Sequence, residues 1–142
     1  MIRNPRFFYI HRSMAQYTLD KTERLNSKTM IARLFSGGNK SFPAFPLRVV
    51  YMWLDPSEGV APASMMVSVS KKRFKRAVKR NLVKRQVREA YRKNKSILLD
   101  AIKEKDKHLV LAFIWLDGNI HSSEEVESKM KRLLYHIVEN ME

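Results

Sequence analysis

The chain has 142 residues and carries 28 Lys and Arg against 14 Asp and Glu, a formal net charge of +14. This excess of positive charge indicates an acidic macromolecular partner. A hydrophobic content of 44% is too high for a disordered basic tail and suits one domain with its own core. Because the chain has no cysteine, disulfides and thiolate metal sites are excluded, which fits a reducing cytoplasm.

No stretch of the sequence predicts a membrane span. The longest apolar run, Leu109–Leu116, has eight residues, whereas a spanning helix needs about 18 or more. The apolar patch Phe7–Ile10 is shorter than a signal-peptide core, and charge resumes directly after it. We therefore expect a cytoplasmic protein without a membrane partner.

The chain divides into a short arm and one domain. Residues 1–18 are basic and show no sustained periodicity, so we expect a loose or partner-dependent N-terminal arm. Residues 19–142 are expected to form a single domain. Its first helix is predicted between an N-cap at Ser27 and a stop at Gly37-Gly38.

Two segments rich in β-branched and aromatic residues predict strands, at Leu47–Leu54 and Ser64–Ser70. Because their connection is too short for a crossover, we expect them to form an antiparallel pair. The apolar run at His108–Leu116 is typical of a strand covered on both faces. Prolines exclude a helix just before Leu47 but allow a short strand within Lys40–Phe45.

The most informative stretch is Lys71–Lys95, which holds 13 of the 28 Lys and Arg residues and a single acid, Glu89. No Gly or Pro follows Ala77 within it, so we predict a helix. At about 100° per residue, cations gather on one side of this helix and apolar residues on another. The cationic side holds Arg80, Asn81, Lys84, Arg85, Arg88 and Arg92. The apolar side holds Val83, Val87, Ala90 and Tyr91.

Two further helices are predicted towards the C-terminus. Ser96 is expected to cap a short helix, Ile97–Lys105, and Ser122 with Glu125 forms a capping box that begins the last one. The last helix has an apolar stripe, made by Val126, Met130, Leu133, Leu134, Ile137, Val138 and Met141. The strand–helix–strand unit around the basic helix predicts a crossover, which is right-handed in about 98% of such units.

A run of Lys and Arg on a helix can be only a solvated face, but such faces normally interleave Glu. The near absence of Glu favours a phosphate backbone as the partner. The mixed α+β frame, Asn81 on the cationic side and aromatic residues on a neighbouring strand favour structured RNA over DNA. A membrane-surface helix is a third reading, which the apolar stripes disfavour because a core uses them better.

The sequence shows no catalytic constellation of its own. The four His residues lack metal-ligand spacing, and the serines near the basic helix have no evident His or Asp partner. Glu124, Glu125 and Glu127 open the last helix, where the helix dipole favours acids, and a metal role for them stays open. If the protein serves an enzyme, we expect the chemistry to lie in a partner.

One motif resembles the signature of the bacterial ribonuclease P protein component. It begins with Ser68-Val69-Ser70-Lys71-Lys72, continues with Arg76-Ala77, and ends with Arg80-Asn81-Leu82-Val83-Lys84-Arg85-Gln86-Val87-Arg88-Glu89. Upstream, Thr22–Leu25 and the Leu34-Phe35 segment also resemble the first helix of that family, and the match runs from about Leu19 to Met141. The RNxxKRxxRE run is specific, because charge alone would not demand the Asn or the order.

The resemblance implies an α+β fold, a two-layer α/β sandwich in the order α-β-β-β-α-β-α, like the second domain of ribosomal protein S5. It also implies a left-handed βαβ crossover, which we prefer here to the general right-handed rule. The protein would bind the catalytic RNA subunit of ribonuclease P and the 5′ leader of precursor tRNA. The RNA would cut that leader with Mg²⁺ held mainly by RNA. The alternative is a non-enzymatic ribosomal or architectural RNA-binding protein.

The resemblance also assigns residues to two surfaces. The RNA-binding residues would be Lys71, Lys72, Arg76, Arg80, Asn81, Lys84, Arg85 and Arg88. The leader-binding cleft, between the first helix and the sheet, would hold Phe35, Tyr51, Ser68 and Ser70. One turn before Phe35 the family often carries another aromatic residue, where this chain has Ile31. No catalytic residue is expected on the protein, and its metal ligands are unknown.

Overall fold

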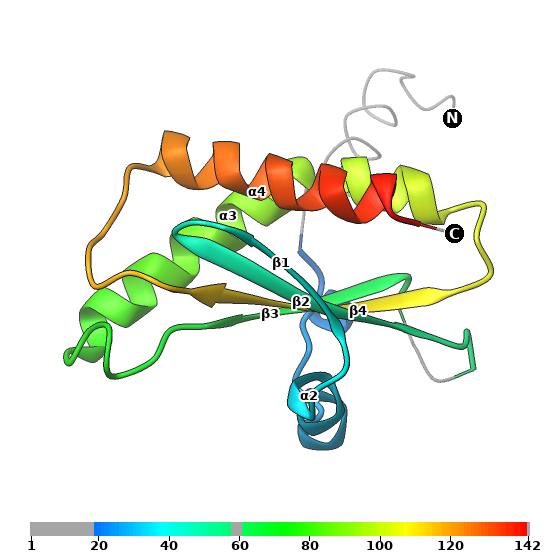
Figure 1. Cartoon of the computed structure of the whole chain (residues 1–142), viewed down its shortest axis with the longest axis horizontal. Coiled ribbons are helices and arrows are strands. Elements are labelled where there is room, and N and C mark those ends of the chain that lie inside the picture. Colours follow the sequence, from blue (N-terminus) through cyan, green and yellow to red (C-terminus); the bar gives the residue numbers. More distant parts are fainter. Residues whose placement is uncertain (1–18, 58–60, 142) are drawn as a thin grey trace, which may run out of the picture.

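The computed structural model describes residues 19–57 and 61–141 (Figure 1). The predicted N-terminal arm, residues 1–18, therefore lies outside the described residues. The elements in chain order are η1 (Lys21–Glu23), α2 (Lys28–Phe35), β1 (Lys40–Ala44), β2 (Leu47–Leu54), β3 (Ala63–Ser68), α3 (Ala77–Ile102), β4 (His108–Trp115) and α4 (Ser123–Glu139). The α+β class and the order α-β-β-β-α-β-α are confirmed.

The four strands form one sheet in the order β1-β2-β4-β3. The predicted pairing of the second and third strands is wrong, because β4 lies between them, antiparallel to β2 and parallel to β3. The connection between β2 and β3 is long enough to pass the end of an intervening strand. Crossing two strand spacings needs only about 10 Å, which residues 55–62 span easily at roughly 3.3 Å each. The predicted crossover, from β3 through α3 to β4, is present. Its left-handedness stays a prediction from the resemblance.

The alternation of each strand divides its side chains between two layers of helix. Figure 1 shows α3 and α4 on one face of the sheet and the short α2 on the other. Leu47, Val49 and Tyr51 of β2 belong to the main core beneath α3 and α4. Val50 and Met52, from the same strand, pack with Leu34 of α2 in a smaller cluster. The α2 face of the sheet is covered only in part, and β2 leaves Arg48, Val50 and Met52 half-buried there.

Side-chain oxygens cap the first turns of α2 and α4, and glycines end α2. Ser27 Oγ accepts a hydrogen bond from the Met30 amide at 3.3 Å, and Gly37 and Gly38 have φ of 95° and 79°. Positive φ is where Gly is favoured, so these residues stop α2 as predicted. Ser122 caps α4 by accepting from the Glu125 amide at 3.2 Å. The predicted capping box there is half formed, because the Glu125 carboxylate contacts His121 instead.

The helix α3 is continuous over 26 residues, so the predicted break at Ser96 is wrong. No Gly or Pro occurs between Ala77 and Ile102, and Ser is only mildly unfavourable inside a helix. The apolar side of α3 is buried as predicted and extends beyond the predicted segment to the far end of the helix. Its buried apolar members are Val83, Val87, Ala90, Tyr91, Leu98 and Ile102. Among the described residues, no helix is both long enough and apolar enough to cross a bilayer.

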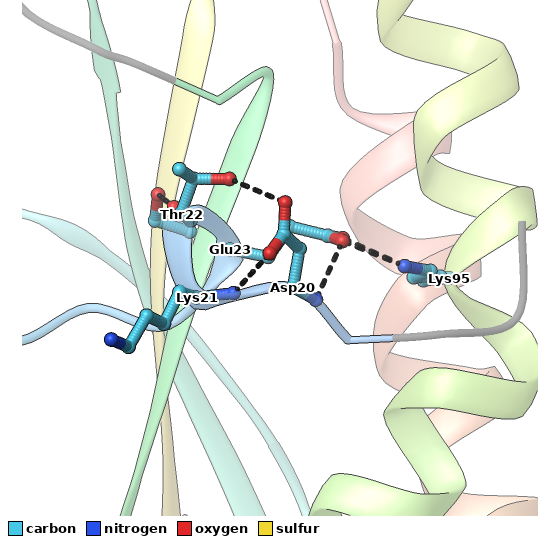
Figure 2. Close-up of polar contacts among 6 residues, drawn as sticks. Asp20, Lys21, Thr22, Glu23 and Lys95 are labelled. Carbon is cyan, nitrogen blue, oxygen red and sulfur yellow. Dashed lines mark hydrogen bonds and ion pairs between the residues drawn. The ribbon is translucent and has the colours of Figure 1, made fainter. Parts of the chain in front are cut away.

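A buried cation ties the start of the domain to α3 (Figure 2). The Lys95 side chain is 2% exposed, and its Nζ donates to both carboxylate oxygens of Glu23, at 2.9 and 2.8 Å. Glu23 also accepts from the Asp20 amide at 3.1 Å, which closes η1. The next residues run along the edge of β3, where the Leu25 amide donates to the Met65 carbonyl at 2.8 Å. The ion pair therefore fixes the segment that covers this edge.

Removing one partner of this pair should cost more than removing both. In the Glu23→Gln variant, Lys95 stays charged in the core, and we expect a loss of about 3 kcal/mol or more in the free energy of unfolding. Lys95→Met should cost less, because the Glu23 side chain is 15% exposed and can reach water. Urea unfolding of both single variants and the double variant measures the coupling. Additive losses would show that the two groups do not depend on each other.

A second ionic cluster holds the turn between β4 and α4. His121 contacts Asp117 at 2.6 Å through Nε2 and Glu125 at 2.9 Å through Nδ1. Its ring meets Trp115 edge-on, with centroids 5.4 Å apart. The hydrogen bond to Asp117, with a further one to Glu125, raises the pKa of His121. The same contact lowers the pKa of Asp117.

This cluster should make stability depend on pH in a defined direction. Since the folded pKa of His121 is raised, its contribution is complete below the ordinary histidine pKa of about 6.5 and is lost as pH rises through the folded value. We expect the difference in unfolding free energy between the native chain and His121→Gln to shrink from about pH 5.5 to about pH 8.5. A difference that is constant or grows over this range would mean that the imidazole is neutral.

Candidate nucleic-acid interface

The outward side of α3 carries a ridge of four cations and one asparagine, defined here as Arg80, Asn81, Lys84, Arg85 and Arg88. Asn81 and Arg85 are exposed, and the other members are half-buried. Lys84, Arg85 and Arg88 form no ion pair within the part of the chain that the structure describes. Because Val83 and Val87 on the opposite side are fully buried, the helix cannot rotate these charges inward. The cationic side of α3 therefore faces outward, and its apolar side faces the core, as the sequence predicts.

Arg80 differs from the rest of the ridge in its contacts. Its Nη1 donates to the carbonyls of Phe74 and Lys75, at 2.9 and 2.8 Å. Phe74 is buried, so this contact pins the loop before α3 against the core. Arg80 therefore positions this loop as well as adding charge to the ridge.

The loop between β3 and α3 places three more of the predicted RNA-binding residues at the start of the ridge. Lys71, Lys72 and Arg76 are all exposed. The Arg73 amide donates to the Ser70 carbonyl at 3.1 Å, which folds the loop into a turn beside the helix. Arg76 is the N-cap residue of α3, and its side chain makes no capping hydrogen bond. These cations extend the ridge beyond the helix.

Beside the ridge lies an open hollow of about 470 Å³. Four arginines line it, Arg85, Arg88 and Arg92 from α3 and Arg24 from the segment after η1. Arg92 hydrogen-bonds Glu89, which lowers the pKa of that carboxylate and offsets positive charge at this end. Arg24 was missed from the sequence, because only the tertiary contact of its segment with β3 brings it to α3.

The second predicted surface lies on the opposite face of the sheet, with α2. Phe35 at the end of α2 is 44% exposed, and Ser68 at the end of β3 is half-buried. Ser68 pairs in register with Ile114 of β4, and Met66, two residues earlier, packs in the cluster beneath α2. Ser70 is exposed but lies past the end of β3, in the turn that begins the loop. Ser68 thus faces the half-covered side of the sheet on which α2 packs, and Phe35 lies at the end of that helix.

The placement of Tyr51 in this cleft is wrong. Its side chain is 3% exposed and lies in the main core beneath α3 and α4, where burial raises the pKa of its hydroxyl. Successive side chains of a strand point to opposite faces, so Val50 and Met52 lie on the α2 side and Tyr51 does not. The alternation of β2 relative to buried Leu47 and Val49 was the signal that could have shown this.

Among residues 19–57 and 61–141, no group of three or more His, Cys, Asp or Glu side chains has an arrangement that could hold a metal ion. His121, Asp117 and Glu125 do meet, but they contact one another directly. Glu124 and Glu125 lie in the first turn of α4, where the helix dipole stabilises acidic side chains. Glu127, one turn on, accepts a hydrogen bond from Asn94 at 3.3 Å and so helps join α4 to α3.

Comparison with known proteins assigns the chain to a family. The family model for ribonuclease P matches residues 19–138. A ribonuclease P protein component from Porphyromonas gingivalis is 44% identical over 129 residues, covering 91% of this chain and 93% of the relative. Its counterpart from Chlorobaculum tepidum is 32% identical over 130 residues, covering 86% and 84%.

Solved structures show the same fold at lower identity. A Staphylococcus aureus RNase P protein mutant with defective mRNA degradation activity superposes with a TM-score of 0.63 at 18% identity, covering 95% of this chain and 98% of that one. The Thermotoga maritima RNase P protein gives 0.55 at 23% identity, covering 84% and 98%. The family match decides against the ribosomal or architectural alternative. The chain belongs to the ribonuclease P protein family and is a protein subunit of that tRNA-processing endoribonuclease.

Proposed function

We propose that this subunit binds the catalytic RNA of ribonuclease P through the ridge and its preceding loop, and the 5′ leader of precursor tRNA on the α2 side of the sheet. The observation that carries the proposal is the ridge itself, whose cations pair with no acid in the described part of the chain and whose helix the core holds in one orientation. A folded duplex or junction of RNA supplies the dense phosphate that such a ridge fits. The RNA, and not the polypeptide, would break the phosphodiester bond.

The charges of the ridge define how this contact should behave. Each Lys or Arg that meets a phosphate releases condensed counterions, so affinity falls steeply as salt rises. For about 6–10 phosphate contacts the loss is about 10³–10⁵ between 50 and 200 mM salt. Seven of the predicted RNA-binding residues of the ridge and loop are cations, namely Lys71, Lys72, Arg76, Arg80, Lys84, Arg85 and Arg88. Assembly with the RNA subunit should therefore be strongly salt-dependent.

The α2 side of the sheet suits an unpaired strand better than a duplex. It offers one exposed aromatic ring, Phe35 at the end of α2, and the half-buried side chains of Val50, Met52 and Ser68 on the sheet. A base stacked on an aromatic ring gains about 1–3 kcal/mol, enough to separate a leader-bearing precursor from its product. Arg48 on the same face can hold a phosphate, although its Nη1 already donates to Ser41 Oγ at 2.8 Å.

Mg²⁺ is the cofactor we propose, held mainly by the RNA. When bound there, the ion would activate water and stabilise charge on the reacting phosphate. The role of this chain would be to neutralise neighbouring phosphates with the ridge, so that the RNA can bring them close together. We place this reaction in the cytoplasm, a reducing compartment in which proteins rarely form disulfides. A chain without cysteine fits that compartment.

The ridge can be tested with one substitution and a matched control. Arg85→Ala should weaken binding to ribonuclease P RNA and lower the slope of log affinity against log salt by about 1, because one phosphate contact is lost. Lys93→Ala removes an exposed cation from the same helix, outside the ridge, and should change neither value. Filter binding over a salt series measures both. An unchanged slope for Arg85→Ala would remove the ridge from this role.

The leader surface is tested by substrate preference. Phe35→Ala should reduce the preference for precursor over mature tRNA by about fivefold or more, the weight of one stacked base, while assembly with the RNA subunit is unaffected. Phe35→Tyr keeps the ring and should keep the preference. Phe45→Ala removes a second phenylalanine, 56% exposed, near His121 and so away from α2. Equal effects of Phe35→Ala and Phe45→Ala on this preference would refute the assignment.

A further inference from the structure

A second hollow with aromatic walls lies where α4 meets the edge strand β1. It has a volume of about 360 Å³ and is lined by Phe42 of β1 and by Arg132, Tyr135, His136 and Glu139 of α4. The rings of Phe42 and His136 are stacked, with centroids 3.6 Å apart and planes 6° from parallel. This stack joins β1 to α4 and forms the floor of the hollow.

Packing does not account for the other two side chains at this place. Tyr135 is 51% exposed, although large aromatic side chains are normally covered. Arg132 is also exposed and forms no ion pair among the residues that the structure describes. An uncovered ring and a guanidinium one turn apart on the same helix are the groups that proteins use to hold planar ligands.

Three lysines converge next to this hollow. Lys40 of β1, with Lys105 and Lys107 from the loop before β4, lines a narrow hollow of about 50 Å³ together with Trp53 and Met141. All three lysines are exposed, and none forms an ion pair within the described part of the chain. Like charges brought together from two separate segments repel one another unless an anion lies between them.

The two hollows form one continuous surface, here called the β1–α4 strip. Lys40 and Phe42 are alternate residues of β1, so they point to the same side of it, about 7 Å apart. The end of α4 supplies Glu139 to one hollow and the next residues supply Met141 to the other. The strip therefore runs from an aromatic end to a cationic end along one edge of the sheet.

The strip is separate from the ridge and from the leader surface. β1 and β3 are the two opposite edges of the sheet, α4 packs on β1 and β2, and α3 packs on β3 (Figure 1). The side of β1 that bears Phe42 faces α4, whereas Phe35 lies with α2 on the other face. RNA held on the ridge leaves the strip open to a different segment.

We propose that the β1–α4 strip binds an unpaired nucleotide of RNA. The base stacks on Tyr135 next to the Phe42–His136 pair, Arg132 covers or hydrogen-bonds it, and the adjoining phosphate lies among the three lysines. Glu139 favours a base as the occupant, because its carboxylate accepts hydrogen bonds from base N–H groups, the N3–H of uracil included, and repels an acidic peptide. Interleaved aromatic rings and cations are the pattern of single-strand binding surfaces.

The test uses the full chain and a uridine octanucleotide that carries one 4-thiouridine. Since the ridge and the leader surface also bind this probe, photocrosslinks are mapped by mass spectrometry after trypsin digestion. We expect crosslinks on the tryptic peptide that begins after Arg132 and contains Tyr135. Tyr135→Trp should keep these crosslinks, and Tyr135→Ala should reduce them at least about fivefold, the weight of a lost stack. Crosslinks that map only to α2 and α3 would overturn the proposal.

Affinity for the same probe separates the two ends of the strip. In a background of Arg85→Ala and Phe35→Ala, which weakens the other sites, Arg132→Ala should lower affinity further, whereas Lys131→Ala, the adjacent exposed cation outside the strip, should not. Replacing Lys105 and Lys107 by Ala should lower the slope of log affinity against log salt by about 0.7 for each lost contact.

Equal effects of Arg132→Ala and Lys131→Ala on affinity would show that the probe responds only to the net charge of the protein, which would contradict the proposal. Displacement of the probe by polyglutamate as readily as by polyuridine would assign the strip to acidic chains in general and overturn the proposal. Because the ridge and leader surface are tested with other substitutions, failure here leaves the proposed function untouched.

Discussion

The structure depends on the way α3 separates its apolar side from its charged side. Val83, Val87, Ala90 and Tyr91 are all buried against the sheet or α4, which fixes the rotation of the helix about its axis. Crowded like charges at i and i+4 spacing destabilise an isolated helix by a few tenths of a kcal/mol per pair. Burial of the four apolar side chains outweighs that cost, at about 0.8 kcal/mol per buried methylene. The charges are thus held outward and close together, ready for a polyanion.

The same helix also organises the start of the domain. Lys95 continues the basic run in sequence, yet it points into the core and pairs with Glu23. That pair fixes the segment that covers the edge of β3 and brings Arg24 to the hollow beside the ridge. A cation that is buried and paired thus shapes the surface on which the exposed cations act.

How much the sequence predicts depends on whether the signal is local. Ser27, Gly37-Gly38 and the stripe of α4 are local signals, and their elements form as predicted. Strand order is not local, because nothing within residues 47–70 indicates that β4 would insert between β2 and β3. The resemblance placed Tyr51 in the cleft, but its alternation with Leu47 and Val49 puts it in the main core. The partner of Lys95 could not be found, since it lies 72 residues away and only packing brings them together. The ridge was predictable because a single helix carries it.

The family assignment, together with the roles proposed for the two surfaces, implies a scaffold that would arrange RNA without cutting it. The most direct test is reconstitution: precursor tRNA cleavage is measured at low Mg²⁺ with ribonuclease P RNA alone, with this protein alone, and with both. The account predicts no cleavage by the protein alone and a large gain when it joins the RNA, greater for precursors with a leader long enough to reach the α2 face. Cleavage by the polypeptide without RNA, or no gain from adding it, would contradict the account.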